Sequence, residues 1–267
     1  MHYEFHGRQD ADAPTLVLSA GLGGVGSFFA SDIAVLGQHY RVLTYDQAGT
    51  GNSPATLGEH YSIRDMAEEL HSLLRTLQIE RCQFMGHALG GLIGLELALI
   101  APQRLTSLTL VNAWAEPNPH SRRCFAIRKH LLNDTGPAAY LHAQAIFLYP
   151  ADWIAANSDR LAAMEAAALQ HFPTTPNLLR RIQALEAFDI STRLGEIDVP
   201  TLVIANRDDM LVPWQQSQRL AEGLNNARFE LLEYGGHASS ITDPEPFHAI
   251  TLDFFKQPHE ARHEQLA

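Results

Sequence analysis

Residues 83–100 read QFMGHALGGLIGLELALI, and this stretch decides the fold class. The segment Gln83–Met85 predicts a short strand, and the turn at residues 86–90 (GHALG) has a glycine at each end. The segment Gly90–Ile100 is almost entirely apolar or small, which is typical of a helix that is buried on most of its surface. A strand, a tight turn and a buried helix in succession predict one unit of a parallel sheet with crossover helices.

Strands and helices alternate on both sides of this unit. Runs of β-branched and apolar residues predict the other strands, and apolar residues at helical spacing predict the other helices. The strands are expected over Thr15–Ser19, Val42–Tyr45, Leu105–Val111, Pro200–Ala205 and Phe229–Tyr234, and the helices over Ile63–Leu77, Trp214–Leu224 and Pro244–Phe255. We therefore predict the α/β class, with a mostly parallel twisted sheet flanked by helices.

The middle of the chain has a different texture. Strand signals disappear between residues 115 and 195, where alanine-rich segments favour helices. Prolines interrupt these segments at Pro137, Pro150, Pro173 and Pro176. We expect four or five helices that form a cap, inserted at residues 115–195 into a core made of residues 1–114 and 196–267.

The composition excludes several classes of protein. The 267 residues include 19 Lys and Arg against 30 Asp and Glu, a formal net charge of −11, which disfavours nucleic acid and anionic membranes as partners. The sequence shows neither a signal-peptide pattern nor an apolar run long enough to span a membrane. Cys82 and Cys124 have no CxxC or zinc-site spacing and are interpreted as reduced thiols. These features predict a cytoplasmic protein and leave its oligomeric state open.

Open parallel sheets bind ligands beyond the carboxyl ends of their strands, so the residues that follow each strand are candidate site residues. These segments are Gly21–Gly24, Asp46, Gly86–Gly90, Arg207–Asp209 and Gly235–His237. Residues 21–26 (GLGGVG) also match the GxGxxG fingerprint of dinucleotide-binding sites, and Asp46 follows at the expected distance. A nucleotide site would leave the turn at residues 86–90 and the late Asp and His without a role, so we favour a different interpretation.

The order of these segments resembles that of the α/β-hydrolases. In that fold a G-x-S-x-G turn joins a strand to a helix, and an acid and a histidine follow at the ends of later strands. Here the turn is residues 86–90, the acid is Asp209, four residues before Pro213, and the histidine is His237. Residues 46–53 (DQAGTGNS) resemble the D-x-x-G-x-G-x-S turn of members with a cap. The resemblance extends along the whole chain and implies an α/β-hydrolase fold with an inserted helical cap.

Ala88 occupies the position at which the family carries Ser, Cys or Asp. A methyl group cannot attack a carbonyl, so no acyl-enzyme forms at this position. Three explanations are open: a native loss with altered chemistry, an engineered Ser-to-Ala change in an ester or enol-lactone hydrolase, or a non-catalytic small-molecule binding protein on a hydrolase fold. A large gain of esterase activity in Ala88→Ser would favour the second explanation, and little change would favour the first.

A closer resemblance is to the RutD family, α/β-hydrolases of a pyrimidine-degradation pathway in which the alanine is native. The segments that carry it are residues 86–90, 120–125, 147–153, 178–181 and 234–238, which include parts of the expected cap. The resemblance implies hydrolysis of a small anionic nitrogen compound from the opened uracil ring, carbamate or 3-aminoacrylate, with release of ammonium. It also implies a cytoplasmic hydrolase of C–N bonds other than peptide bonds, with a role in nitrogen utilization.

His237 and Asp209 provide two members of a catalytic triad. We expect Asp209 to orient His237, which acts as a general base on a water molecule in the space that a serine hydroxyl would fill. The backbone N–H groups of Leu22 and Leu89 are expected to form the oxyanion hole. The sequence has no HxH or HExxH pattern, so we expect neither a metal nor a cofactor.

The candidate substrate-binding residues are Trp114, Arg122, Arg123 and Tyr149. The arginines could counter an anionic substrate and the rings could wall a pocket, although paired arginines on a helix often face solvent and aromatic residues often only pack. Weaker candidates of the same kind are Arg128, Arg180 and Arg181.

Three polar residues beside the candidate site are expected to be structural. His87 is interpreted as a packing and hydrogen-bonding residue, and Asp46 as a group that fixes the glycine turn after it. Asp208 is interpreted as a solvated neighbour of the true acid, because its spacing to Pro213 is one residue too long.

Overall fold

The computed structural model describes residues 1–257 and is built on a seven-stranded sheet in the order β1-β3-β2-β4-β5-β6-β7. Strand β1 runs antiparallel to β3, and every other neighbouring pair is parallel, which confirms the predicted mostly parallel sheet. The strands are β1 (Tyr3–Gly7), β2 (Thr15–Ser19), β3 (Arg41–Tyr45), β4 (Cys82–His87), β5 (Leu105–Val111), β6 (Thr201–Asn206) and β7 (Ala227–Leu232).

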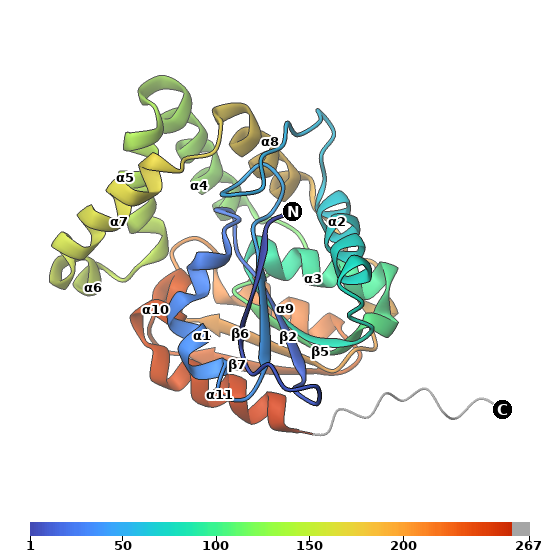
Figure 1. Ribbon diagram of the computed structural model, residues 1–267. Coiled ribbons are helices and arrows are strands. Elements are labelled where there is room, and N and C mark those ends of the chain that lie inside the picture. Colours follow the sequence, from blue (N-terminus) through green and yellow to red (C-terminus); the bar gives the residue numbers. More distant parts are fainter. Residues whose placement is uncertain (258–267) are drawn as a thin grey trace.

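Helices cover both faces of the sheet (Figure 1). One face packs against α1 (Ala30–Leu36), α10 (Ser239–Thr242) and α11 (Pro244–Lys256), and the other against α2 (Ile63–Thr76), α3 (Leu89–Ile100) and α9 (Trp214–Gly223). Successive strand residues point to opposite faces, so Phe84 packs in the core with α2 and α3 while Met85 packs in the core with α1 and α11. Burial on both faces explains the nearly continuous apolar runs of the inner strands.

The chain between β5 and β6 forms five α-helices, which we call the inserted helices. They are α4 (Pro119–His130), α5 (Pro137–Leu148), α6 (Ala151–Ala156), α7 (Ser158–Gln170) and α8 (Thr175–Ala187), with a π-helical turn, η3, at Leu131–Thr135. Polar caps and prolines set two of their starts: the side chain of Asn118 caps α4 and that of Thr174 caps α8, each just ahead of a proline. Figure 1 shows these helices grouped beyond one end of the sheet, with α5, α6 and α7 to one side.

The structure differs from the predicted elements at the edges of the sheet. Strand β1 was not predicted, because it is an edge strand of mostly exposed residues without a clear apolar pattern. Strand β7 ends at Leu232, two residues before the predicted Tyr234, where the chain turns toward Gly235 with φ 130°.

Short 3₁₀ helices complete the connections between the larger elements. They are η1 (Gly26–Phe29), η2 (Pro102–Arg104), η4 (Leu194–Glu196) and η5 (Gly236–Ala238). Among the helices of residues 1–257, none combines the length and the apolar character required to cross a bilayer.

Candidate active site

The turn between β4 and α3 is strained at its centre. Ala88 has φ 48° and ψ −113°, a conformation that residues with a side chain rarely adopt. The flanking glycines leave no room for a side chain, since a Cβ on Gly86 would lie 2.3 Å from the carbonyl carbon of Gly90, and one on Gly90 would lie 1.9 Å from the carbonyl oxygen of Ser19. The sharp turn expected from the glycine spacing is present, with Ala88 at its apex.

The two expected oxyanion-hole donors come from neighbouring turns. Leu89 is the first residue of α3, so its N–H has no acceptor within the helix. Leu22 follows β2, which pairs in parallel with β4 so that Ser19 lies opposite Gly86. The pairing places the turn of Leu22 and the turn of Ala88 at the same end of the sheet, where a ligand binds in folds of this class.

His237 and Asp209 form a buried pair at this end of the sheet. The Nδ1 atom of His237 lies 2.7 Å from Oδ2 of Asp209, and both side chains are almost fully buried. The second oxygen of Asp209, Oδ1, accepts hydrogen bonds from the backbone N–H groups of Leu211 and Val212 at 2.8 and 2.9 Å. Because an ionised carboxylate only accepts hydrogen bonds, the ring donates through Nδ1 and leaves Nε2 free to accept a proton.

Two side chains fix the backbone of His237. Its carbonyl accepts hydrogen bonds from Nε2 of His87 at 2.6 Å and from Nδ2 of Asn112 at 2.9 Å. The ring of His87 stacks on Phe28, and burial lowers the pKa of His87 to about 3, with a further contribution from nearby His237. His87 is therefore neutral and holds the backbone of His237 in place. Asn112 was not predicted as a site residue. The sequence signal that could have found it is its position directly after β5, and the structure shows it with φ 51°.

Asp208 is exposed, as expected of a solvated neighbour of Asp209, but it also has a structural role that the sequence does not predict. Its carboxylate accepts hydrogen bonds from the N–H groups of Gly235 and Gly236 at 3.2 and 2.9 Å. Both glycines have positive φ, which points their N–H groups at the carboxylate. Asp208 thus anchors the loop that carries His237, although its side chain is exposed.

Asp46 fixes the turn that follows it, as expected. Its two oxygens accept hydrogen bonds from the N–H of Gly26 at 2.9 Å and from the N–H of Asn52 at 2.8 Å. In a dinucleotide site the equivalent acid would bind a ribose, and the N–H groups of the glycine loop would face a phosphate. Because these groups are bonded to each other here, the structure gives no support to the nucleotide interpretation of residues 21–26.

Neither cysteine offers a substitute nucleophile. Cys82 and Cys124 are free and buried. Burial raises the pKa of the Cys82 thiol to about 12 and also raises that of Cys124. Both thiols are therefore protonated at neutral pH and poorly nucleophilic.

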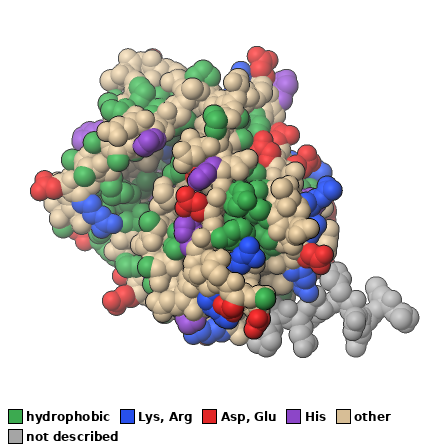
Figure 2. Space-filling model, in the orientation of Figure 1, with side chains coloured by type: hydrophobic (Ala, Val, Ile, Leu, Met, Phe, Trp, Pro, Cys, Tyr) green, Lys and Arg blue, Asp and Glu red, His purple; other side chains and the backbone are tan. Residues whose placement is uncertain are grey.

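The structure does not bring all four predicted substrate-binding residues to the site. Trp114 is buried, and its indole N–H has no acceptor within residues 1–257. Arg122 and Arg123 are exposed, and Arg122 donates to the carbonyl of Glu186. Figure 2 shows charged side chains of both signs dispersed over the face seen there, with hydrophobic side chains in a hollow on the side of α5 to α7.

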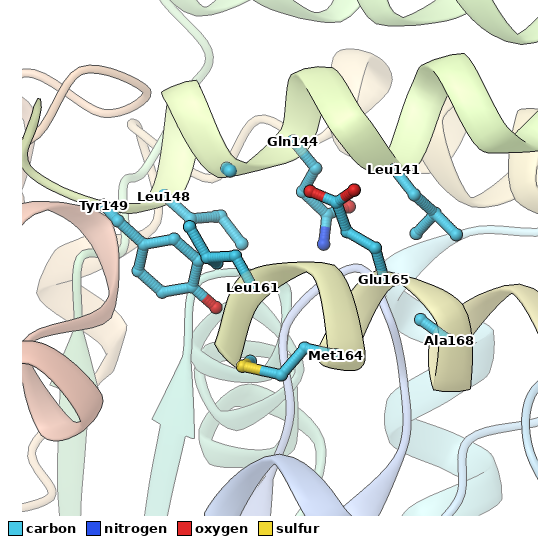
Figure 3. A pocket seen from close by; sticks show the side chains of 9 residues that line it. Leu141, Gln144, Leu148, Tyr149, Leu161, Met164, Glu165 and Ala168 are labelled. Atoms are coloured by element: carbon cyan, nitrogen blue, oxygen red, sulfur yellow. The ribbon is translucent and has the colours of Figure 1, made fainter. Parts of the chain in front are cut away.

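Tyr149 lies at a small cavity of about 60 Å³ between α5 and α7 (Figure 3). Its ring also stacks at a tilt on Trp153, with the centroids 4.8 Å apart. The cavity is lined by Leu141, Gln144, Ala145, Leu148, Tyr149, Leu161, Met164, Glu165 and Ala168. Ala88 and His237 are not among them, but Leu148 adjoins the segment of His237, since a Cβ on Gly236 would lie 2.8 Å from the carbonyl oxygen of Leu148.

Helix α8 is fastened to the loops around the site. The side chain of Asn177 accepts from the N–H of Leu57 at 3.1 Å and donates to the carbonyl of Ala55 at 2.8 Å. Arg181 donates to the carbonyl of Leu22 from both Nε and Nη2, at 3.1 Å each. The sequence favours Arg181 only weakly as a substrate-binding residue, and the structure places it against the turn of an expected oxyanion-hole donor.

Comparison with known proteins identifies the family of the chain. Residues 14–244 match the family described as the alpha/beta hydrolase fold. A protein of Pseudomonas syringae named "Putative carbamate hydrolase RutD" is 66% identical over 92% of this chain and 95% of its own length. Proteins of the same name from Stutzerimonas stutzeri and Agrobacterium fabrum are 64% and 47% identical, each over 95% of this chain and at least 96% of their own length.

The chain belongs to the RutD family of α/β-hydrolases. Among solved structures, it is similar to the enol-lactonase from Burkholderia xenovorans LB400, with a TM-score of 0.87, 29% identity and 96% of each chain covered. The predicted fold and family are therefore confirmed. Within this RutD-family fold, the site combines a His–Asp pair and a strained turn with a methyl group in place of a nucleophile.

Proposed function

We propose that this protein hydrolyses carbamate and releases ammonium by activating water at the His237–Asp209 pair. The observation that carries the proposal is the intact pair beside a turn whose apex, Ala88, has no nucleophilic atom. The RutD relatives are named as carbamate hydrolases, and this supports the choice of substrate. We further propose, from the family resemblance, a cytoplasmic role in pyrimidine degradation, with 3-aminoacrylate as the alternative substrate.

The proposed reaction consumes one water for each carbamate. Water adds through its oxygen to the carbamate carbon while Nε2 of His237 takes a proton from it. The negative charge on the tetrahedral intermediate is stabilised by the N–H groups of Leu22 and Leu89. The protonated ring then gives its proton to the nitrogen, the C–N bond breaks, and ammonia and bicarbonate leave; ammonia takes up a further proton to become ammonium.

The proposed groups are sufficient for a moderate rate enhancement. General-base catalysis typically contributes about 10²- to 10⁴-fold, and one oxyanion-hole donor contributes about 2.7 to 4 kcal/mol of transition-state stabilisation. Of the proposed substrate contacts, Trp114 is favoured by its unpartnered buried N–H. Arg122, Arg123 and Tyr149 remain proposals that single substitutions test.

The decisive experiment is the time course of ammonium release from freshly prepared carbamate. Buffer alone, the protein and its His237→Ala variant are compared under identical conditions, with His248→Ala as the matched control because His248 also pairs with a buried aspartate. We expect acceleration by the protein and by the control, and none by His237→Ala. An unchanged rate in His237→Ala would exclude this mechanism. Saturable binding of carbamate without turnover would instead support a binding protein.

Ester or enol-lactone hydrolysis is the second candidate function. The similarity to the enol-lactonase of Burkholderia xenovorans LB400 favours it, because the backbone that presents a nucleophile in hydrolases of this fold is present here. The Ala88→Ser variant tests it with an ester substrate. A large gain of esterase activity would support this candidate, and little change would support water activation at Ala88.

A further inference from the structure

Two arginines of the inserted helices are buried without an acidic partner. Arg181 of α8 is 0% exposed and Arg128 of α4 is 3% exposed. Neither forms an ion pair with any carboxylate of the described chain. Burial of an unpaired cation is strongly unfavourable, so the two groups require an explanation beyond packing.

The hydrogen-bond acceptors of both guanidinium groups are neutral. Arg181 donates to the carbonyl of Leu22 and to the side-chain oxygen of Gln47. Arg128 donates to the hydroxyl of Tyr140 and to a side-chain amide oxygen. Nη1 of Arg181 and Nε of Arg128 are buried and have no acceptor within residues 1–257. Both N–H bonds of Nη1 of Arg181 are therefore without an acceptor among the described residues.

Tyr140 contacts one of the two arginines directly. The guanidinium of Arg128 lies over its ring, 4.8 Å from the centroid, and α4, which carries Arg128, contacts α8, which carries Arg181. Glu69 acts on Arg181 only through space, and its carboxylate accepts a hydrogen bond from Tyr61 at 2.8 Å. Burial lowers the pKa of Arg181 to about 10, so this guanidinium is still charged at neutral pH.

Arg181 contacts the turn that carries Leu22, an expected oxyanion-hole donor. Its Nε and Nη2 lie 3.1 Å from the carbonyl oxygen of Leu22, the residue whose N–H is an expected oxyanion-hole donor. The N–H and carbonyl of one residue are within about 4 Å of each other. Gly24 of the same turn has φ 75°, and a Cβ there would lie 2.8 Å from Nη2 of Arg181. The guanidinium therefore packs directly against the backbone of this turn.

We propose that Arg181, supported by Arg128, binds the anionic substrate of this site. One carboxylate oxygen of a small monoanion lies in the oxyanion hole, and the other accepts hydrogen bonds from Nη1 of Arg181. The inference rests on the proposed function and names its substrate class, a monoanion of the size of carbamate rather than a neutral amide or ester. The guanidinium also offsets the second negative charge that develops when water adds to the carbamate carbon.

Binding of an unreactive pair of probes tests the proposal without requiring turnover. Acetate has the size and charge of carbamate, and acetamide has the size without the charge. Both are titrated at constant ionic strength into the protein and into its Arg181→Gln, Arg128→Gln and Arg180→Gln variants, with amide NMR shifts as the signal. Arg180→Gln is the matched control, because Arg180 is adjacent on α8 but only partly buried, and it contacts Glu59.

We expect saturable acetate binding that is tighter than acetamide binding in the wild type and in Arg180→Gln. Acetate binding should weaken by about 10- to 100-fold in Arg181→Gln, as for loss of a charged hydrogen bond, and by a smaller factor in Arg128→Gln. Acetamide binding should be unchanged. Should Arg181→Gln fail to fold because the contact with Leu22 is lost, weaker acetate binding in Arg128→Gln supports the proposal and unchanged binding overturns it.

Three results would overturn the proposal: no preference for acetate in the wild type, unchanged acetate binding in folded Arg181→Gln, or equal loss of acetate and acetamide, which would indicate that Arg181 only positions the turn. The ammonium assay separates this inference from the proposed function. A charge-dependent acetate site in a protein that does not hydrolyse carbamate would leave the anion site standing and reject the proposed reaction.

Discussion

The protein contains two His–Asp pairs with the same separation and different surroundings, each with a buried aspartate. Nδ1 of His237 lies 2.7 Å from Asp209, and Nε2 of His248 lies 2.7 Å from Asp32. The first pair joins loops at the carboxyl ends of β6 and β7, whereas the second joins α1 to α11 on one face of the sheet. Both carboxylates are fully buried as side chains.

The surroundings decide what each pair can do. Asp209 is held by two further backbone N–H groups, while Oδ2 of Asp32 is buried with no hydrogen-bond donor among the described residues, and burial raises the pKa of Asp32. His237 uses Nδ1 for its aspartate, which leaves Nε2 free of this contact, and its carbonyl bonds to His87 of the turn at residues 86–90. A His–Asp pair is thus a stabilising contact in one place and a candidate general base in another, and its position at the strand ends makes the difference.

The largest expected effect is on catalysis. Asp209→Asn should lower carbamate hydrolysis by about 10²-fold or more, because an amide can favour the wrong tautomer of His237. Asp32→Asn should keep the rate within about twofold, as the second pair has no route to the substrate. Ammonium release at saturating carbamate measures both variants. Equal losses would show that the two pairs do not differ in function.

The free energy of unfolding should depend more on the pair of His248 and Asp32 than on the pair of His237 and Asp209. His248→Ala leaves the Asp32 carboxylate unpaired and should lower the free energy of unfolding by about 3 kcal/mol. His237→Ala leaves Asp209 with the N–H groups of Leu211 and Val212, so we expect a loss of about 1 kcal/mol. Urea unfolding of the two variants measures the difference. A greater loss in His237→Ala would contradict this account of the surroundings.

His87, which donates a hydrogen bond to the carbonyl of His237, should make the free energy of unfolding sensitive to acid. The pKa of His87 is 6.5 when unfolded and about 3 when folded, so the unfolded state binds more protons between these values. Stability from this group is complete above pH 6.5 and falls by about 1.4 kcal/mol per unit as the pH decreases toward 3. His87→Gln should flatten the pH dependence of urea unfolding, and His60→Gln, at an exposed histidine, should not. Parallel curves for wild type and His87→Gln would reject a buried neutral imidazole.

The smallest effect is expected at the turn of Ala88, on the free energy of unfolding. Ala88→Gly should raise the free energy of unfolding by about 1 kcal/mol, because glycine adopts φ 48° without strain. Carbamate hydrolysis should be unchanged, since no reacting atom is removed. Ala98→Gly, in the interior of α3, should instead lower stability by about 1 kcal/mol or more. Destabilisation in both variants would show that the turn is not strained.

The sequence predicted the strand-end side of the site better than the inserted helices. Side chains at Gly86 and Gly90 would clash with neighbouring backbone, so the sharp turn could be inferred locally from the two glycines. Arg122, Arg123 and Arg181 are all arginines on helices in the same part of the chain, yet Arg122 and Arg123 are exposed and Arg181 is fully buried. Which face of α4 or α8 meets the core depends on packing with distant loops, such as the contact of Arg181 with Leu22, 159 residues away.

The sequence by itself determined the parallel sheet, the insertion between β5 and β6, and the absence of a nucleophile at Ala88, because these follow from local patterns and from one side chain. Tertiary structure alone decided which of two His–Asp pairs lies at the strand ends, that Asp208 anchors the loop of His237, and that Arg181 contacts the turn of Leu22. These contacts join segments far apart in the chain, and no local spacing records them. Their geometry is set by the order of the strands and the packing of α8.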